Sequence, residues 1–445
     1  MTRKRVIVLD VVGLSLKHFD NPEKIPHIAG LLGSGTLHRL VPPFPAVTLP
    51  VQATLTTGCL PEHHGVVANG FYYPETMQVS FWDQADRLVQ AERIWERLRK
   101  KNGKLTTALL FMQNSLYADC KVVITPKPMH SEEGLIPWCY SKPAGWYEKV
   151  SRELGEFPLQ HYWGPLAGIQ SSRWIAGAAV KTMEKHKPDL MFVYLPHLDY
   201  CCQKFGPDSQ EVTEELGKVD KEVGRIIAGV DQLGLLDETV FLVLSEYAFA
   251  KVEDAVPLNR ILRQHDLLKV RTIQGREYLD IELSPAFAMV DHQVAHIYLK
   301  PGFTKKVGDV LGKEPGIDFL LQAGEEKKRY GINHQRCGEI VAVSRRDKWF
   351  SYYWWENEKK APDFADKVDI HSKPGFDPLE LFIEPKSFKI SRDTRLIRGS
   401  HGYPPTGAAD HVPLLISGRL EKEPPAAGPL AMTDVAGLIE EILGG

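Results

Sequence analysis

The chain lacks any long hydrophobic run. Hydrophobic residues make up 43% of its 445 residues and charged residues 25%, yet no stretch approaches the ~18 consecutive apolar residues of a membrane-spanning helix. The first apolar run, residues 6–9, stops at Asp10 and is too short for the core of a signal peptide. Together these absences predict a protein that contacts no membrane and lies in the cytoplasm.

An excess of charge of one sign is also missing. The formal net charge is -3, and the sequence pI is about 6.6. Surfaces that bind nucleic acid polymers are ordinarily strongly basic. We therefore expect no nucleic acid polymer among the partners, and the sequence does not indicate an oligomeric state.

Closely spaced cysteine pairs of the C-x-x-C kind are absent too. In a reducing compartment we expect the six cysteines to be mostly buried thiols. Cys201 and Cys202 are adjacent and lie near a candidate metal ligand, so a redox or soft-metal role for them stays open as an alternative.

What the sequence does contain is a series of continuous apolar runs that alternate with predicted helices. Such runs are typical of parallel strands buried on both faces. Predicted strands cover residues 5–10, 106–112, 189–195 and 239–244, and predicted helices cover residues 26–32, 51–57, 91–101, 172–185, 212–229 and 435–443. This alternation predicts an α/β fold with a parallel sheet covered by helices.

The pattern changes in the middle of the chain. Residues 339–344 and 349–355 are typical of antiparallel strands, and a chain of this length exceeds one ordinary core. We therefore expect residues 1–249 and 362–445 to form the core and residues 250–361 to form an inserted α+β cap.

Polar residues follow or close several of the predicted core elements. Asp10 closes the first strand, Asp199 follows the strand ending at residue 195, Glu246 follows the strand ending at residue 244, and His401 lies in a glycine-flanked turn. Ligands of open α/β sheets bind at the carboxyl ends of the strands. Three carboxylates at one edge would repel one another without a cation, so the set predicts a divalent metal site, although each residue alone is equally compatible with a structural role.

Thr48 is the candidate nucleophile. It follows Pro45-Ala46-Val47 and is expected at the start of a helix, where the dipole favours an anion. A hydroxyl in that position beside a metal can attack phosphorus. The alternative is a simple helix cap.

The residues around Thr48 resemble a known family. Thr48, the run Gly58-Cys59-Leu60-Pro61-Glu62-His63-His64-Gly65-Val66 and the run Asn69-Gly70-Phe71-Tyr72 are similar to the type I phosphodiesterase/nucleotide pyrophosphatase family of the alkaline phosphatase superfamily. The resemblance implies an alkaline-phosphatase-like three-layer α/β/α sandwich with a mostly parallel central sheet and an inserted α+β cap. It also implies that Asn69 hydrogen-bonds a phosphoryl oxygen.

Members of this family are two-metal hydrolases, usually with zinc, and the resemblance implies two groups of ligands here. The nucleophile-side ligands would be Asp10, Thr48, Glu246 and Tyr247, and the ligands of the second ion would be Asp199, Gln203 and His401. The sequence departs from the family pattern where Gln203 and Tyr247 replace histidines and Glu246 replaces an aspartate.

These departures leave the metal content open. An oxygen-rich set suits Mg²⁺, Mn²⁺ or Ca²⁺ better than zinc, or ferric iron if Tyr247 is a phenolate. One or two divalent ions per chain are expected, and none is an alternative. His63, His64, His197, His292 and His296 are possible substitute ligands.

Two further segments border on this prediction. The aromatic run of residues 349–355 is interpreted either as packing of the cap or as a platform for a flat leaving group, and the turn-rich residues 369–378 as a joining loop or a pocket border.

The sequence therefore predicts a metal-dependent hydrolase that acts on a small phosphorylated substrate: a phosphodiester, a nucleotide pyrophosphate or a related ester or phosphonate. The alternative is a non-catalytic family member that binds a phosphorylated ligand or a protein. A phosphoglycerate-mutase-like isomerase is a third, less favoured reading.

Overall fold

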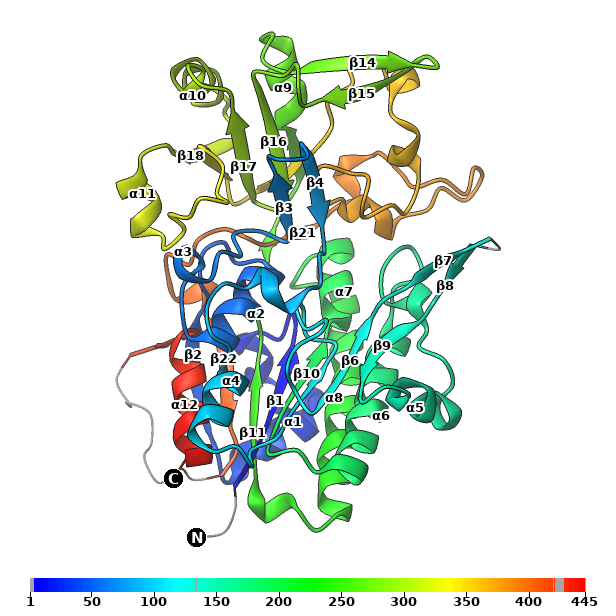
Figure 1. Cartoon of the computed structure of the whole chain (residues 1–445), viewed down its shortest axis with the longest axis vertical. Helices are drawn as coiled ribbons and strands as arrows, with labels where there is room; N and C mark the ends of the chain where they lie inside the picture. The colour runs from blue at the N-terminus through cyan, green and yellow to red at the C-terminus, as the bar shows by residue number, and fades with distance from the viewer. Residues whose placement is uncertain (1–3, 133, 419, 421–427, 445) are drawn as a thin grey trace.

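The computed structural model describes residues 4–132, 134–418, 420 and 428–444, and it shows a large α/β core with a smaller cap above it (Figure 1). Nine strands form the core sheet: β23 (Leu430–Ala431), β2 (Thr36–Val41), β22 (Val412–Ile416), β11 (Thr239–Leu244), β1 (Arg5–Val11), β10 (Leu190–Leu195), β5 (Thr107–Leu110), β6 (Val122–Pro126) and β9 (Cys139–Lys142), in this spatial order. The five strands from β11 to β6 are parallel, whereas β22 and β9 run antiparallel to their neighbours. The predicted α/β class with a mostly parallel sheet is confirmed.

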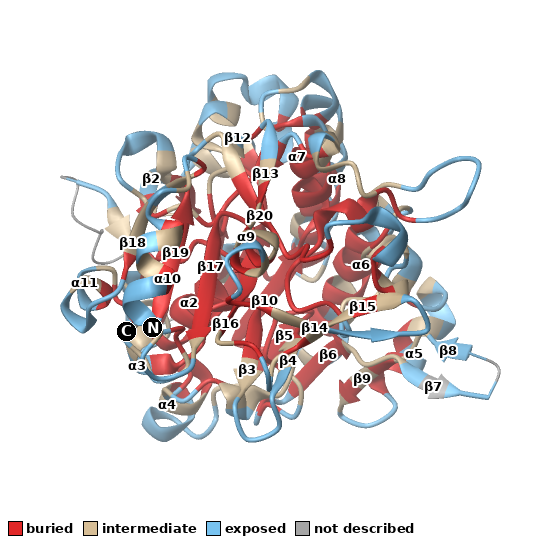
Figure 2. Ribbon diagram, turned by 90° about the horizontal axis from the view of Figure 1, so that it is seen from above, coloured by how far each residue is buried: buried red, intermediate tan, exposed pale blue. Residues whose placement is uncertain are grey.

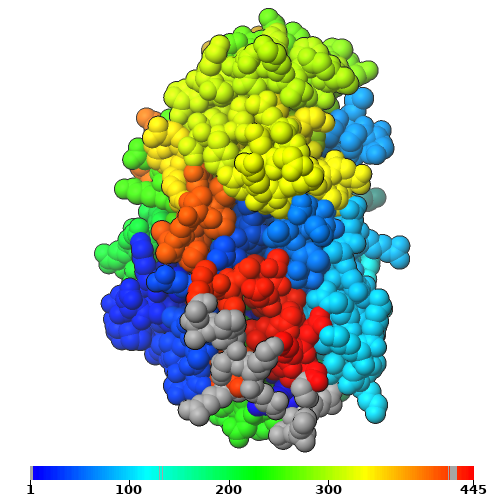
Figure 3. All heavy atoms as spheres, turned by 90° about the vertical axis from the view of Figure 1, so that its left-hand side faces the viewer, coloured from blue at the N-terminus to red at the C-terminus, as the bar shows by residue number. Residues whose placement is uncertain are grey.

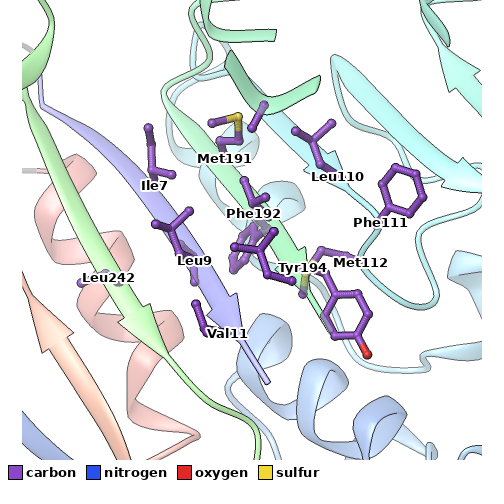
Figure 4. Packing of buried hydrophobic residues seen from close by; sticks show 14 of the residues in the cluster. Ile7, Leu9, Val11, Leu110, Phe111, Met112, Met191, Phe192, Tyr194 and Leu242 are labelled. Atoms are coloured by element: carbon purple, nitrogen blue, oxygen red, sulfur yellow. The ribbon is translucent and has the colours of Figure 1, made fainter. Parts of the chain in front are cut away.

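The centre of the sheet is apolar on both faces. Every residue of β1, β10 and β11 is buried, and side chains such as Leu9, Phe192 and Leu242 pack between neighbouring strands (Figure 4). Burial on both faces removes the alternation of polar and apolar residues that a half-exposed strand would show. This is why the sequence shows these strands as continuous apolar runs.

Helices cover both sides of the sheet (Figure 1). One group consists of α1 (Pro26–Gly30), α5 (Trp146–Leu154), α6 (Ile169–His186), α7 (His197–Phe205) and α8 (Gln210–Gln232), and the other of α2 (Thr48–Thr57), α4 (Ile94–Lys101) and α12 (Asp434–Gly444). Helix α6 packs on α8, and α12 packs on α2 and on β1. The core is therefore a three-layer arrangement.

The cap is built on a four-stranded antiparallel sheet. Its strands are β16 (Ala286–Asp291), β17 (Val294–Leu299), β19 (Ile340–Ser344) and β18 (Ile317–Leu321), in this order, with helices α9 (Leu258–Gln264), α10 (Thr304–Leu311) and α11 (Gly324–Arg329). The short strand pairs are β3 (Gly70–Tyr73) with β4 (Gln78–Phe81), β7 (Met129–Ser131) with β8 (Gly134–Ile136), β12 (Ala250–Lys251) with β21 (Gly399–Ser400), β13 (Asp254–Pro257) with β20 (Lys348–Ser351), and β14 (Lys269–Ile273) with β15 (Arg276–Asp280).

Segments from outside residues 250–361 contribute to the hydrophobic centre of the cap. Tyr72 of β3 packs against Phe287 and Tyr298, with ring centroids 5.0 and 4.7 Å apart, and Phe376 and Ile390 belong to the same buried cluster. Figure 3 shows the segment near residue 400 (orange) at the boundary between cap and core. The predicted domain boundaries stay a prediction.

The aromatic run of residues 349–355 differs from its expectation. Only Lys348–Ser351 is a strand, β20, and it pairs in parallel with β13 rather than antiparallel. All four residues of Tyr352–Trp355 are buried in the cap (red in Figure 2). Because these neighbouring aromatic side chains all fill the interior, the run packs the cap and does not offer an exposed platform.

His64 holds the end of the short helix α3 (Pro61–His64) against α2. Its Nε2 lies 3.0 Å from Thr54 Oγ1, and its Nδ1 accepts a hydrogen bond from the Val66 N–H. Both contacts are satisfied by the neutral ring, and burial lowers the pKa of His64 to about 3. The folded chain therefore resists protonation at this residue.

We expect this histidine to make the fold sensitive to acid. The unfolded chain binds a proton near pH 6.5 that the folded chain does not, so the stabilisation is present above pH 6.5 and is lost as the pH falls towards 3. Between pH 7 and pH 5 the loss in unfolding free energy is about 2 kcal/mol. Urea unfolding at both pH values should show a difference smaller by this amount in His64→Gln, and an equal difference in both proteins would contradict the assignment.

Candidate active site

Two carboxyls lie side by side at the carboxyl end of the sheet. Asp10 is the penultimate residue of β1, and Glu246 follows β11 by two residues. The strands are parallel neighbours with Asp10 beside Leu244, and both carboxyls are fully buried. The sequence prediction that these two residues meet at one edge therefore agrees with the geometry.

A glutamine side chain joins the two carboxyls. The Gln52 Nε2 amide donates to Glu246 Oε1 at 2.7 Å and to Asp10 Oδ2 at 3.3 Å, while Gln52 Oε1 accepts from the Gln113 N–H at 2.7 Å. Gln52 lies one helical turn after Thr48 on α2, so both side chains face the same end of the sheet. Sequence reasoning missed Gln52.

The carboxyl pair holds a proton more tightly than isolated acids do. Burial raises the pKa of Asp10 to about 7. Burial and the nearby Asp10 charge hold the pKa of Glu246 well above its usual range. The two groups also hydrogen-bond each other, which requires a proton on one of them.

Thr48 is the first residue of α2, and its side chain is 3% exposed. Its Oγ1 lies 3.0 Å from the Tyr247 hydroxyl, which donates to Asp199 Oδ1 at 3.2 Å. Burial keeps the pKa of Tyr247 well above its usual range, so the phenol retains its proton for Asp199. Thr48 then donates to the Tyr247 oxygen, and the three groups form a continuous chain of hydrogen bonds.

Asp199 and Gln203 lie on one helix, α7, rather than on the loop that the sequence was expected to form. Their spacing of four residues places them on the same helical face, and Gln203 Nε2 donates to Asp199 Oδ2 at 2.6 Å. Burial raises the pKa of Asp199 to about 7. Helical geometry, not a loop, is what brings these two side chains together.

His401 completes this side of the site. Its Nδ1 donates to the Ala46 carbonyl at 2.9 Å, its ring stacks on Tyr247 with centroids 3.6 Å apart, and its Nε2 lies 3.7 Å from Asp199 Oδ1. Burial and the neighbouring His292 hold the pKa of His401 well below its usual range. The neutral Nε2 therefore presents a lone pair towards a carboxylate.

Asn69 connects the core to the cap. Its Oδ1 accepts from the Leu49 N–H at 2.9 Å, and its Nδ2 donates to Asp291 Oδ1 at 3.1 Å. The Asn69 backbone N–H donates to the other Asp291 oxygen at 2.7 Å. One amide hydrogen of Nδ2 is thus engaged, and the second is the one that could reach a phosphoryl oxygen.

The turn between β16 and β17 covers the site. His292 in this turn has a φ of 60° and is therefore not on a strand, as the sequence had suggested. Its ring lies between His401 and Phe376, at centroid distances of 3.8 and 3.9 Å, and the neighbouring Gln293 N–H donates to the His401 carbonyl at 3.0 Å. We refer to Asp291–Gln293 as the cap turn.

The other candidate histidines lie away from the carboxyls. His197 Nε2 contacts Glu215 at 2.6 Å, His296 Nε2 donates to the Val67 carbonyl at 3.0 Å, and His64 contacts Thr54. His63 is largely exposed. Cys201 and Cys202 are buried thiols, as are three of the other four cysteines.

A metal ion between Asp10 and Glu246 does not fit the side chains present. The Gln52 N–H groups point at the oxygen atoms that would have to bind the ion, and an N–H donor and a cation compete for the same lone pairs. A Tyr247 phenol that keeps its proton also argues against ferric iron. Within the described residues, no group of three or more His, Cys, Asp or Glu side chains is arranged to hold a metal.

The second group of ligands fits an ion better. Asp199 Oδ1 and His401 Nε2 face each other at 3.7 Å, and the buried atoms His401 Nε2 and Gln203 Oε1 make no hydrogen bond. A carboxylate, an amide oxygen and a neutral imidazole are a suitable donor set for one Mn²⁺, Mg²⁺ or Zn²⁺ ion.

The fold and the site define an alkaline-phosphatase-like α/β protein. The structure has a TM-score of 0.62 to murine ectonucleotide pyrophosphatase/phosphodiesterase 5, at 19% identity with 99% of this chain and 95% of that chain covered. It has a TM-score of 0.65 to phosphonoacetate hydrolase from Sinorhizobium meliloti, at 17% identity and the same coverage. The predicted alkaline-phosphatase-like fold is confirmed.

The chain belongs to the type I phosphodiesterase / nucleotide pyrophosphatase family, whose model matches residues 6–377. It is 24% identical over 250 residues to a pyrophosphatase/phosphodiesterase of Schizosaccharomyces pombe, which covers 54% of this chain and 42% of that protein. It is also 23% identical over 336 residues to ectonucleotide pyrophosphatase/phosphodiesterase family member 7 of Rattus norvegicus, covering 74% of this chain and 66% of that one. The chain spans less than half of the first curated relatives that it matches.

None of the helices in the described part of the chain is long and apolar enough to cross a membrane. The cytoplasmic location and the absence of membrane and nucleic acid partners stay predictions, and several relatives carry the word ectonucleotide in their names.

Proposed function

We propose that this chain hydrolyses a small phosphoester, of the phosphodiester, nucleotide pyrophosphate or phosphonate class, with Thr48 Oγ1 as the nucleophile. The observation that supports it most is the hydrogen-bonded chain from Thr48 through Tyr247 to Asp199. A hydroxyl becomes a nucleophile when a neighbouring group can take its proton. Here Tyr247 can accept the Thr48 proton while it passes its own proton to Asp199.

The other residues suit the same reaction. The start of α2 favours the negative charge of a phosphoryl group at Thr48, and the second amide hydrogen of Asn69 can bind a phosphoryl oxygen. One divalent ion held by Asp199, Gln203 and His401 would neutralise charge on the phosphoryl group. The nucleophile-side carboxyls contribute no step through a metal.

The comparisons support the class of substrate. The murine neighbour has been solved as an inactive threonine-to-alanine variant in complex with AMP, and the bacterial neighbour in complex with phosphonoacetate. Both ligands carry a phosphoryl group next to a small organic part. We propose a ligand of this kind for the present chain, and the cap as the element that selects it.

The direct test is turnover of bis-p-nitrophenyl phosphate, AMP esters and phosphonoacetate by the purified chain. The assay should be run after chelation and again after addition of Zn²⁺, Mn²⁺, Mg²⁺ or Ca²⁺. We expect release of the leaving group from at least one phosphodiester, with a cation dependence that Gln203→Ala weakens. No turnover of any substrate under any of these conditions would exclude the proposal.

A second candidate is a non-catalytic protein that binds a phosphorylated ligand. It is favoured by the closure of the site, since Thr48 is 3% exposed and the cap turn lies directly on His401, itself 1% exposed. Calorimetric titration with AMP or phosphate distinguishes the two: saturable binding without turnover supports the second candidate.

A further inference from the structure

Gln52 is the one side chain that contacts both nucleophile-side carboxyls by printed donor geometry, and it lies where no sequence pattern placed a functional residue. Its side chain is 1% exposed. It donates to Glu246 at 2.7 Å and to Asp10 at 3.3 Å. An amide has two N–H hydrogens on one nitrogen, so a single group can serve both acceptors.

The orientation of this amide is fixed from the opposite side. The Gln113 backbone N–H donates to Gln52 Oε1 at 2.7 Å, and a backbone N–H requires an acceptor. If the amide were flipped, its NH₂ would face that N–H and its oxygen would face two carboxyls. The nitrogen must therefore point at Asp10 and Glu246.

Gln113 is held in place independently of the carboxyls. It follows β5 in a turn in which Phe111 has a φ of 62°, and its side-chain Oε1 accepts from Gln84 Nε2 at 2.6 Å. The Phe111 ring packs on Phe157 at a centroid distance of 4.5 Å. The acceptor end of Gln52 is thus anchored by a packed turn of the core.

We propose that the Gln52 side chain takes the place of a cation between Asp10 and Glu246, so that no divalent ion binds these two carboxyls while Gln52 is present. The two N–H groups satisfy the oxygen atoms that an ion would otherwise need, and the anchored amide fills the space between them. Any ion of this chain then binds at Asp199, Gln203 and His401. The inference rests on the site assigned under the proposed function.

Counting bound metal tests the inference without any measurement of turnover. Each protein is stripped with a chelator, titrated with Mn²⁺ and analysed for metal per chain. In the wild type we expect Asp10→Asn to leave the stoichiometry unchanged. Gln52→Ala should gain about one ion per chain, and the double variant Gln52→Ala/Asp10→Asn should lose it again.

A second variant covers the case in which Gln52→Ala folds poorly. Gln52→Glu keeps the shape of the side chain but places a third carboxyl beside the pair, which only a cation can stabilise. Its melting temperature should rise when Mn²⁺ is added, by more than that of the wild type. Gln203→Ala is the matched control, because it changes a glutamine of the second ligand group and should not create a new site.

Two results would overturn the inference. One is a wild-type metal content that falls when Asp10 is replaced by Asn. The other is a Gln52→Glu protein whose melting temperature and metal content respond to Mn²⁺ no more than those of the wild type. If the metal counts are as expected but no phosphoester is turned over, the inference stands and the proposed function fails.

Discussion

Replacing Thr48 by alanine should reduce phosphodiester turnover by on the order of a thousandfold or more. The variant loses the only hydroxyl that contacts Tyr247 in the described site, and with it the nucleophile itself. Thr48→Ser keeps the hydroxyl and removes one methyl group, so it should retain measurable activity. The measurement is kcat with bis-p-nitrophenyl phosphate for each purified variant.

A second threonine on the same helix supplies the control. Thr56 is buried, and its hydroxyl donates to the Gln52 backbone carbonyl at 2.6 Å, within α2. Thr56→Ala removes the same chemical group without touching Tyr247, so turnover should change by less than about tenfold. Melting curves establish that all variants are folded. Full activity in Thr48→Ala would show that another group attacks the phosphorus.

Replacing Lys373 by methionine should destabilise the protein by about 3–5 kcal/mol. The Lys373 ammonium is 1% exposed and binds Asp377 Oδ2 at 2.8 Å and Glu380 Oε1 at 2.6 Å. Methionine fills a similar volume but leaves two buried carboxyls without a cation. Urea unfolding at neutral pH measures the loss.

The matched control is Lys367→Met. Lys367 pairs with Asp363 at 2.9 Å, but its side chain is 62% exposed, and exposed ion pairs contribute at most about 1 kcal/mol. The triple change Lys373→Met/Asp377→Asn/Glu380→Gln should recover part of the loss, because it removes the charges together. Equal effects of Lys373→Met and Lys367→Met would contradict the role assigned to the buried cluster.

The strands of the core could be predicted because their burial is complete. β11 has the predicted bounds, and β1 and β10 differ from them by one residue. From parallel neighbours it also follows that Asp10 and Glu246 lie side by side. This part of the site needed only the apolar runs and the direction of the strands.

The contacts that cross between distant segments could not be predicted. Gln52 is a polar residue in a helix, which ordinarily signals a solvated face, and its role depends on the Gln113 N–H, 61 positions further on. The pairing of Asn69 with Asp291 spans 222 positions. Only a weak signal was available for the latter: a carboxylate directly after an apolar strand. The family resemblance carried over ligand positions but not the amide that replaces an ion.

The cap turn has a consequence for how this protein can diversify. Asp291 binds the residue that positions the start of α2, His292 stacks on His401, and Gln293 bonds to the backbone of the same histidine. A graft that exchanged the cap for that of another family member would therefore disturb the core unless it retained this tripeptide. Specificity can evolve freely on the outer strands and helices of the cap, while the turn is inherited together with the chemistry beneath it.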